Sequence, residues 1–150
     1  MANEIGTMGI TLGYATEATA GSKPSSFTTV ANVYELPEYD ASAEGLDVTD
    51  LSDLEWMRYI PGLKDAGDDI SISVHMVESN ITAWDALVDS AKAAYASGKN
   101  TWFKITVPNW TKSFYFAGLP QKVGFGGASV NEVFSGTLHV TPNQIDGWTE

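Results

Sequence analysis

The sequence contains no cysteine, few basic residues and no long hydrophobic segment. Without cysteine, disulfide bonds, thiolate nucleophiles and zinc–thiolate sites are excluded. Only 8 lysines and arginines stand against 19 acidic residues, for a formal net charge of −11. The basic surface that grips nucleic-acid phosphates or an anionic membrane is therefore not expected. The sequence has no run of about 18 apolar residues, so no transmembrane helix is predicted. The N-terminal residues lack the basic and apolar regions of a signal peptide.

Groups that carry out catalysis are also scarce. There are two histidines, His75 and His139, both on Ser/Thr-rich faces of predicted strands, and one arginine. No Gly-x-Ser-x-Gly, His-Glu-x-x-His or P-loop motif occurs. Asp47, Asp50 and Asp53 are spaced by three residues, whereas an EF-hand needs acids at every second position and a central glycine. We therefore expect no enzyme, no catalytic or metal-binding residues and no cofactor.

The residues that are present predict one mainly β domain spanning 1–150. Residues 69–78 alternate strictly, with Ile70, Ile72 and Val74 on one face and serines and a histidine on the other, which predicts a half-buried strand. Further strands are expected at 8–14, 27–36, 100–107, 113–117 and 130–140, with a short one at 121–125. Residues 1–25 are interpreted as an N-terminal arm and 141–150 as a polar C-terminal tail.

A single helix is expected after the alternating strand. Thr82 and Asp85 resemble a capping box, apolar residues from Trp84 to Tyr95 follow at helical spacing, and Gly98 suits a left-handed C-terminal cap. The fold class predicted is an antiparallel β-sandwich or barrel flanked by this helix, with a long inter-strand loop at about 38–68.

This loop lies in an unusually acidic stretch. Residues 35–69 hold 11 of the 19 acidic residues and only Arg58 and Lys64 as bases. Strand signals within it are weak, at 45–48 and 56–60, yet compact domains rarely contain so long an irregular segment. Trp56, Tyr59 and other apolar side chains are costly to leave in water. We expect another subunit to cover them; a solvated flexible loop is the alternative.

Polar residues gather on one face of three predicted strands. They are Ser71, Ser73 and His75; Lys104 and Thr106; and Ser135, Thr137 and His139. If subunits pair through open strand edges in a head-to-tail manner, a ring closes and these faces line its hole. An ordinary solvated sheet face is the alternative.

The order of these elements resembles a known family. The run IPGLKDAGDD at 60–69, leading into the alternating strand, is similar to the segment before a central strand in major tail tube proteins of long-tailed bacteriophages. WDAL at 84–87, Pro108, FYFAG at 114–118 and VFSGTL at 133–138 follow in a similar order. The resemblance covers about residues 26–142, and GLKDAG is its most specific part.

The resemblance implies a structural virion protein, from a phage or a phage-derived particle, that assembles into hexameric rings stacked as a tube for genome ejection. It implies self-association, contacts with the tape measure, terminator and baseplate or distal tail proteins, and DNA passing without specific binding. Its expected place is the virion tail, reached from the host cytoplasm. The residues assigned to the inter-subunit loop are Asp47, Asp50, Asp53, Trp56, Tyr59, Ile60, Leu63, Lys64 and Asp65. Those assigned to the lumen are Asp69, Ser71, Ser73, His75, Lys104, Thr106, Glu132, Ser135, Thr137 and His139.

Two other functions are open. A monomeric carbohydrate- or cell-wall-binding β-sandwich would use exposed Trp102 and Trp110. A carboxylate-dependent glycosidase needs a spaced acid pair, which 19 acids supply by chance. The loop discriminates, because a monomeric binding module would fold Trp56, Tyr59 and Ile60 into its own core, whereas a tube subunit would extend them toward a neighbour.

Overall fold

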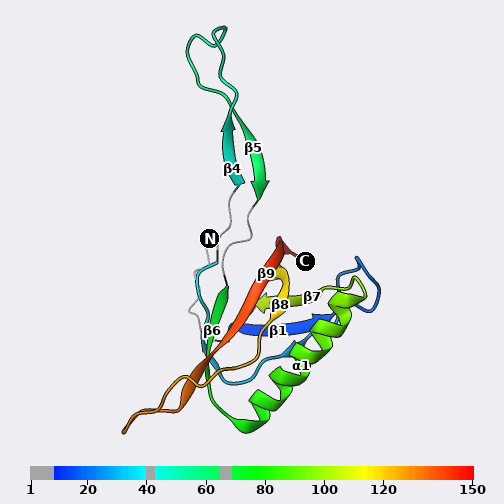
Figure 1. The fold of residues 1–150 in the computed structure, drawn as a ribbon, viewed down its shortest axis with the longest axis vertical. Helices are drawn as coiled ribbons and strands as arrows, with labels where there is room; N and C mark the ends of the chain where they lie inside the picture. The colour runs from blue at the N-terminus through cyan, green and yellow to red at the C-terminus, as the bar shows by residue number, and fades with distance from the viewer. Residues whose placement is uncertain (1–8, 40–42, 65–68) are drawn as a thin grey trace.

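The protein folds as a curled antiparallel sheet with one helix and a separate hairpin (Figure 1). The structure is a computed structural model that describes residues 9–39, 43–64 and 69–150, without the side chains of residues 43, 44 and 62–64. The strands are β1 (Thr11–Thr16), β2 (Thr28–Thr29), β3 (Val33–Glu35), β4 (Ala43–Asp47), β5 (Tyr59–Lys64), β6 (Ile70–His75), β7 (Thr101–Thr106), β8 (Ser113–Pro120) and β9 (Ser135–Thr149); the helix is α1 (Glu78–Ala96).

The main sheet has seven strands in the order β2-β1-β7-β8-β9-β6-β3, and β4 and β5 form a second, two-stranded sheet. Every strand pair is antiparallel. The predicted fold class, mainly β with one flanking helix, is confirmed. Among the described residues, no helix is long and apolar enough to cross a membrane.

The core lies between one face of the curled sheet and α1. Period-two alternation places Ile72, Phe103 and Leu138 on this face, all at most 2% exposed. The helix contributes Trp84, Leu87 and Val88 to the same cluster. The indole Nε1 of Trp84 donates a hydrogen bond of 2.8 Å to the Gln121 carbonyl, which satisfies its polar atom within the core.

The helix begins earlier than the sequence pattern predicts. It starts at Glu78, Val77 precedes it in an extended conformation, and no side chain caps its first amides. Thr82 is therefore an interior residue, and its hydroxyl donates to the Glu78 carbonyl at 3.0 Å instead of capping. The expected capping box is wrong. At the other end Gly98 has φ +78, so the predicted left-handed cap is confirmed.

Several strand boundaries also differ from expectation. The segment 27–36 is divided into β2 and β3 by Asn32, whose φ of 62 turns the chain. Residues 141–149, expected as a polar tail, form the second half of β9 and pair with β8. Residues 121–134 contain no strand, so the final strand begins at Ser135 rather than at residue 130. Within the expected N-terminal arm, residues 11–16 form β1 in the main sheet.

The loop between β1 and β2 folds across the sheet face opposite the core. Glu17, only 3% exposed, accepts hydrogen bonds from Trp102 Nε1 at 3.1 Å and from the Gly21 amide at 2.8 Å. Lys23 forms an ion pair with Asp146 at 2.8 Å and lies 3.9 Å from the centre of the Tyr115 ring. These contacts bury Trp102 under the loop, leaving it 6% exposed.

Candidate interaction surface

The β4–β5 hairpin projects from the main body (Figure 1). Its strands pair only with each other, through Gly45 with Pro61, Leu46 with Ile60 and Asp47 with Tyr59. A two-stranded hairpin is at best marginally stable in water. Its distal loop therefore needs either local contacts or a partner to keep one conformation.

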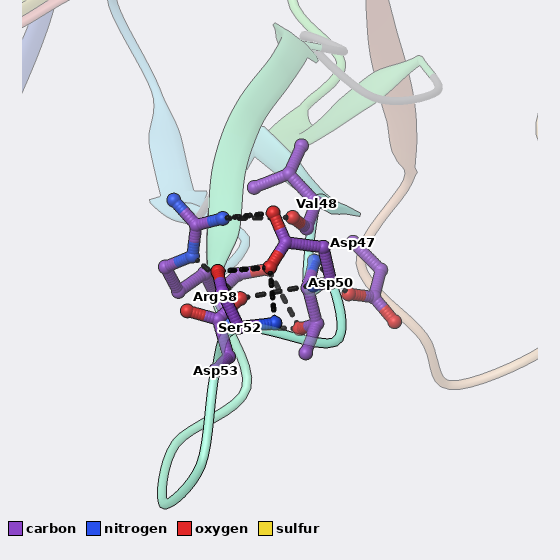
Figure 2. Close-up of polar contacts among 7 residues, drawn as sticks. Asp47, Val48, Asp50, Ser52, Asp53 and Arg58 are labelled. Atoms are coloured by element: carbon purple, nitrogen blue, oxygen red, sulfur yellow. Dashed lines mark hydrogen bonds and ion pairs between the residues drawn. The ribbon is translucent and has the colours of Figure 1, made fainter.

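Local contacts are present at the tip and centre on Arg58 (Figure 2). Its guanidinium donates to Asp53 at 2.8 Å, to Asp50 at 3.3 Å and to the Val48 carbonyl at 3.3 Å. Its amide donates to the Thr49 hydroxyl at 2.7 Å. Because the ion pairs are exposed to solvent, each contributes little to stability. Their main effect is to select one shape for the tip.

The tip carboxylates also bind the backbone around them. The Asp47 carboxylate accepts from the Thr49 amide at 2.9 Å, Asp50 from the Ser52 amide at 2.8 Å and Asp53 from the Asp50 amide at 2.9 Å. The Ser52 hydroxyl donates to Asp50 as well. Side chains that bind amides two or three residues away are typical of tight turns. The spacing of three therefore belongs to a folded turn, not to the calcium loop that it superficially suggests.

The same hydrogen bonds lower the pKa values of these exposed carboxyls from their ordinary value of 3.8. For Asp47 the main cause is the Thr49 amide, and for Asp50 it is the Ser52 hydroxyl, followed by the Ser52 amide. The pKa of Asp53 is lowered by the Asp50 amide and then by Arg58. Each bond favours the charged carboxylate, so the tip keeps its negative charge well below neutral pH.

Large apolar side chains are exposed on this acidic hairpin. Leu51 is 101% exposed, Leu54 91% and Trp56 80%. Tyr59 and Ile60 on β5 are also exposed. The sequence-predicted residues Asp47, Asp50, Asp53, Trp56, Tyr59 and Ile60 are thus together on one projection. Leu63 and Lys64 lie on β5 with side chains outside the described part, and Asp65 lies outside the described residues altogether.

A second polar surface lies on β6 and β9, on the face away from the core. The pairing sets Ser71 opposite His139, Ser73 opposite Thr137 and His75 opposite Ser135, and the Ser71 hydroxyl lies 3.3 Å from His139 Nδ1. Tyr34 of β3 stacks on His75 with ring centres 4.5 Å apart. Six of the residues predicted to line a lumen therefore form one continuous patch.

Of the other predicted lumen residues, Asp69 adjoins this patch, whereas Lys104, Thr106 and Glu132 lie elsewhere. Lys104 of β7 is paired with Tyr115 of β8, which is itself paired with Gly147 near the far end of β9. The Nζ of Lys104 lies 5.6 Å from the centre of the Phe27 ring. Thr106 lies two residues beyond Lys104, at the end of β7. Glu132 is exposed in the loop before β9. Asp69 lies just before β6 and continues the patch, because it accepts from the hydroxyl of Thr141 at 2.9 Å, two residues beyond His139 on β9. The three strands thus do not present a single polar row.

The fold is shared with chains of two kinds of large particle. A chain of the anti-feeding prophage baseplate, a six-fold symmetrised structure, aligns with a TM-score of 0.61 at 11% identity over 97% of this chain and 95% of that chain. A chain of the native gene transfer agent virion aligns with a TM-score of 0.58 at 16% identity, over 98% and 100%. A chain from the tail of the empty gene transfer agent particle, with C6 symmetry, gives 0.53 at 17% identity, over 92% and 94%.

These identities are low, so the likeness establishes the fold. No protein-family model matches the sequence, and no curated protein matches it.

The described residues include no group of histidine and acidic side chains that could hold a metal ion. The two candidates for sugar stacking differ in access, because Trp102 is buried under the β1–β2 loop, whereas Trp110 is 48% exposed and packs against Trp148 at 5.5 Å.

The structure adds Arg58, Leu51 and Leu54 to the hairpin surface. The sequence analysis treated Arg58 only as a charge and did not predict that it binds Asp50 and Asp53. The signal for this role was that the one arginine of the sequence lies among many acidic residues.

Proposed function

We propose that this protein is a structural subunit of the tail of a phage or phage-derived particle, and that copies of it close into hexameric rings that stack into a hollow tube. The observation that carries the proposal is the projecting hairpin, on which Leu51, Leu54 and Trp56 are exposed. Arg58 binds Asp50 and Asp53 in its turn. A monomer gains nothing by presenting these side chains to water. Burial of each would contribute about 1.5–3 kcal/mol.

The fold-level likeness supports the same function. Two of the similar structures have six-fold symmetry, and all three are parts of particle tails, baseplates or virions. The polar patch of β6 and β9 fits a tube lining, because it exposes serine, threonine and histidine rather than a basic surface. In this proposal the chain is not an enzyme. DNA passes without specific binding, and tape measure, terminator and distal tail proteins meet the ends of the tube.

A carbohydrate-binding monomer receives less support. It would fold Trp56, Tyr59 and Ile60 into its own core, yet all three are exposed, and it would expose Trp102, which is 6% exposed. Of the two candidate tryptophans for sugar stacking, Trp110 is half exposed.

The decisive experiment removes the distal hairpin and leaves the sheet intact. Leu46 and Ile60 are directly paired, so excising residues 47–59 and joining these two by Asn-Gly leaves a tight hairpin. We expect the shortened chain to remain folded by circular dichroism and to form no tubes by electron microscopy, while the wild-type chain forms tubes or six-fold rings. Normal tubes from the shortened chain would contradict the role assigned to the hairpin.

A further inference from the structure

A second group of exposed apolar side chains lies on the β8–β9 loop, which comprises residues 121–134. Phe125 is 78% exposed, Val130 88% and Val133 70%. Every residue of this loop is described, and none is in a helix or strand. Connections longer than about 12 residues are uncommon in compact domains unless they serve a function. Together, the length of the loop and its exposed apolar residues indicate a contact surface.

The loop is anchored at both ends, although its middle is exposed. The Gln121 amide donates to the His139 carbonyl at 2.9 Å, and the Met76 amide donates to the Phe134 carbonyl at 2.9 Å. Between these anchors, the rings of Phe125 and Phe134 lie 5.7 Å apart and join the two arms of the loop. The loop therefore presents its apolar residues from a fixed base on the sheet.

The β8–β9 loop and the hairpin tip lie at opposite ends of the longest axis of the molecule (Figure 1). The loop is the orange segment at the lower left of the view, and the tip is at the top. Copies joined end to end in one orientation therefore bring the tip of each copy to the loop of the next. Such a contact is heterologous, so every added copy still offers a free tip or a free loop.

Charge distinguishes the surfaces that the tip is able to meet. Residues 47–58 carry four acidic residues against the single Arg58, whereas the loop carries Lys122 and Glu132 and is neutral overall. Two tips brought together would place like charges in contact, and a tip on a loop avoids this. Lys122 is exposed and forms only a long ion pair with Asp89, at 4.0 Å, so its amine is available to a carboxylate of the tip.

The apolar surface is large enough for a specific contact. An aromatic side chain removes about 150–250 Å² from water when it is buried. Three aromatic and four aliphatic side chains are exposed on the two surfaces, so their combined burial approaches the roughly 1,000 Å² that a specific interface needs. They are Trp56, Phe125 and Phe134, and Leu51, Leu54, Val130 and Val133.

We propose that the β8–β9 loop receives the hairpin tip of a second copy of this chain. The occupant is a second copy because the tip and the loop lie at opposite ends of one molecule, are both apolar, and together supply the area of a stable contact. This inference rests on the proposed function, since it names the surface to which the hairpin docks within the assembly.

Cross-linking between copies tests the contact directly, because the natural sequence contains no cysteine. Leu54→Cys places a thiol on the tip and Val130→Cys places one on the loop, both at exposed positions. The two variants are mixed under conditions in which wild-type protein forms tubes, then oxidised mildly and separated by non-reducing electrophoresis. We expect the main product to be a disulfide-linked pair of one tip variant and one loop variant.

Ala93→Cys, at an exposed position on α1, is the matched control for the loop cysteine. It should cross-link to Leu54→Cys at least tenfold less than Val130→Cys does. A tip that cross-links equally well to both positions, or mainly to another tip, would overturn the inference.

A second pair of full-length variants tests whether the contact is needed for assembly. Leu51→Asp with Leu54→Asp disables the tip, and Val130→Asp with Val133→Asp disables the loop. All four side chains are exposed, so the sheet should remain folded, as circular dichroism would verify. We expect neither variant alone to form tubes. An equimolar mixture should regain association by sedimentation velocity, because the intact tip of one variant meets the intact loop of the other.

The outcomes separate this inference from the proposed function. If wild-type protein forms tubes and the Val130/Val133 variant forms them equally well, the loop assignment is overturned and the tube function stands. If the two disabled variants do not associate on mixing, another surface receives the tip and the inference fails. A wild-type chain that stays monomeric near 1 mM, the range of very weak binding, overturns both.

Discussion

At the scale of single residues, buried polar groups in this protein hold loops onto the sheet. Glu17 is 3% exposed, and both of its carboxylate oxygens accept hydrogen bonds, one from Trp102 and one from Gly21. A buried carboxylate that loses such a partner is costly, because the remaining charge cannot be solvated. Glu17 thus couples the β1–β2 loop to a tryptophan on β7, and this coupling explains why Trp102 is unavailable as a surface platform.

Trp102→Phe should therefore reduce the free energy of unfolding by about 1–3 kcal/mol, since the indole N–H is lost while Glu17 stays buried. Urea denaturation followed by circular dichroism measures the effect. Trp110→Phe is the control, because Trp110 is 48% exposed and no hydrogen bond of its indole is observed in the described structure; its stability should change by less than about 0.5 kcal/mol. Equal effects of the two substitutions would contradict the role given to Glu17.

Close backbone packing makes a second residue-scale prediction. A Cβ added at Gly118 of β8 would lie 2.6 Å from the Thr141 carbonyl oxygen and 2.9 Å from Val140 Cγ1. A Cβ at Gly136 of β9 would lie 2.6 Å from Met76 Sδ, which is part of a flexible side chain. Gly118→Ala should cost about 1–3 kcal/mol through overpacking, and clearly more than Gly136→Ala. Thermal unfolding of the two variants, compared side by side, tests the order; the reverse order would refute it.

At the scale of elements, the β4–β5 hairpin differs from every other strand pair because its distal part is specified by its own side chains. Arg58, Asp50 and Asp53 fix the turn, and the apolar residues around them remain exposed. A binding element that already has its bound shape loses less conformational entropy when it docks. The hairpin is thus ordered enough to recognise a partner without being packed against its own domain.

Acid should loosen this tip before it affects the sheet. The pKa values of Asp47, Asp50 and Asp53 are lower in the folded tip than their ordinary value of 3.8. Their contribution is therefore complete above that value and is lost as the pH falls through the lowered pKa values. NMR shifts of the Thr49, Asp50 and Ser52 amides should hold steady from neutral pH to about pH 4 and change below it. Simultaneous change of the Phe103 and Leu138 amides would contradict a separate transition.

At the scale of the whole molecule, charge opposes assembly while exposed apolar surface favours it. The net charge is −11, and most of the imbalance lies in residues 35–69. Copies brought together in a ring repel one another over distances set by the ionic strength. In the proposed tube, the same negative charge would keep DNA phosphates from adhering to the wall, so a charge that slows assembly would be compatible with the passage of DNA.

Assembly should accordingly be faster at higher salt. The screening length falls from about 30 Å at 0.01 M to about 8 Å at 0.15 M ionic strength, so repulsion between subunits weakens over this range while apolar burial does not. Light scattering of concentrated wild-type protein measures the rate. The chain without residues 47–59 is the control and should not assemble at either salt concentration. A slower wild-type reaction at 0.15 M would indicate that attraction between opposite charges dominates the contact.

Some features of this protein were determined by local sequence. Period-two alternation of Ile70, Ile72 and Val74 fixes which face of β6 is buried, whatever the strand pairs with. Helical spacing places Trp84, Leu87 and Val88 in the core, and Gly98 ends the helix because a left-handed conformation is accessible there. The acidic, aromatic composition of the hairpin segment likewise predicted a surface that the domain itself does not bury.

Other features depended on contacts between distant residues. Residues 141–149 look like a polar tail by composition, yet β8 supplies backbone partners that make them a strand. Thr82 resembles a cap, but the helix starts at Glu78, where Asn80 donates to the Ala31 carbonyl and anchors the first turn. Trp102 appeared to lie on an open polar face until the β1–β2 loop, held by Glu17, covered it.

The sequence by itself thus determined the fold class, the buried faces and the acidic projection, because periodicity and composition act over neighbouring residues. Only the tertiary structure decided that the polar residues of β6 and β9 form one patch while Lys104 lies apart, since strand order and register set those distances. It also decided that Trp148 lines a groove with Ile10 and Val33. No local sequence pattern encodes the proximity of these three residues, because it results from the curl of the whole sheet.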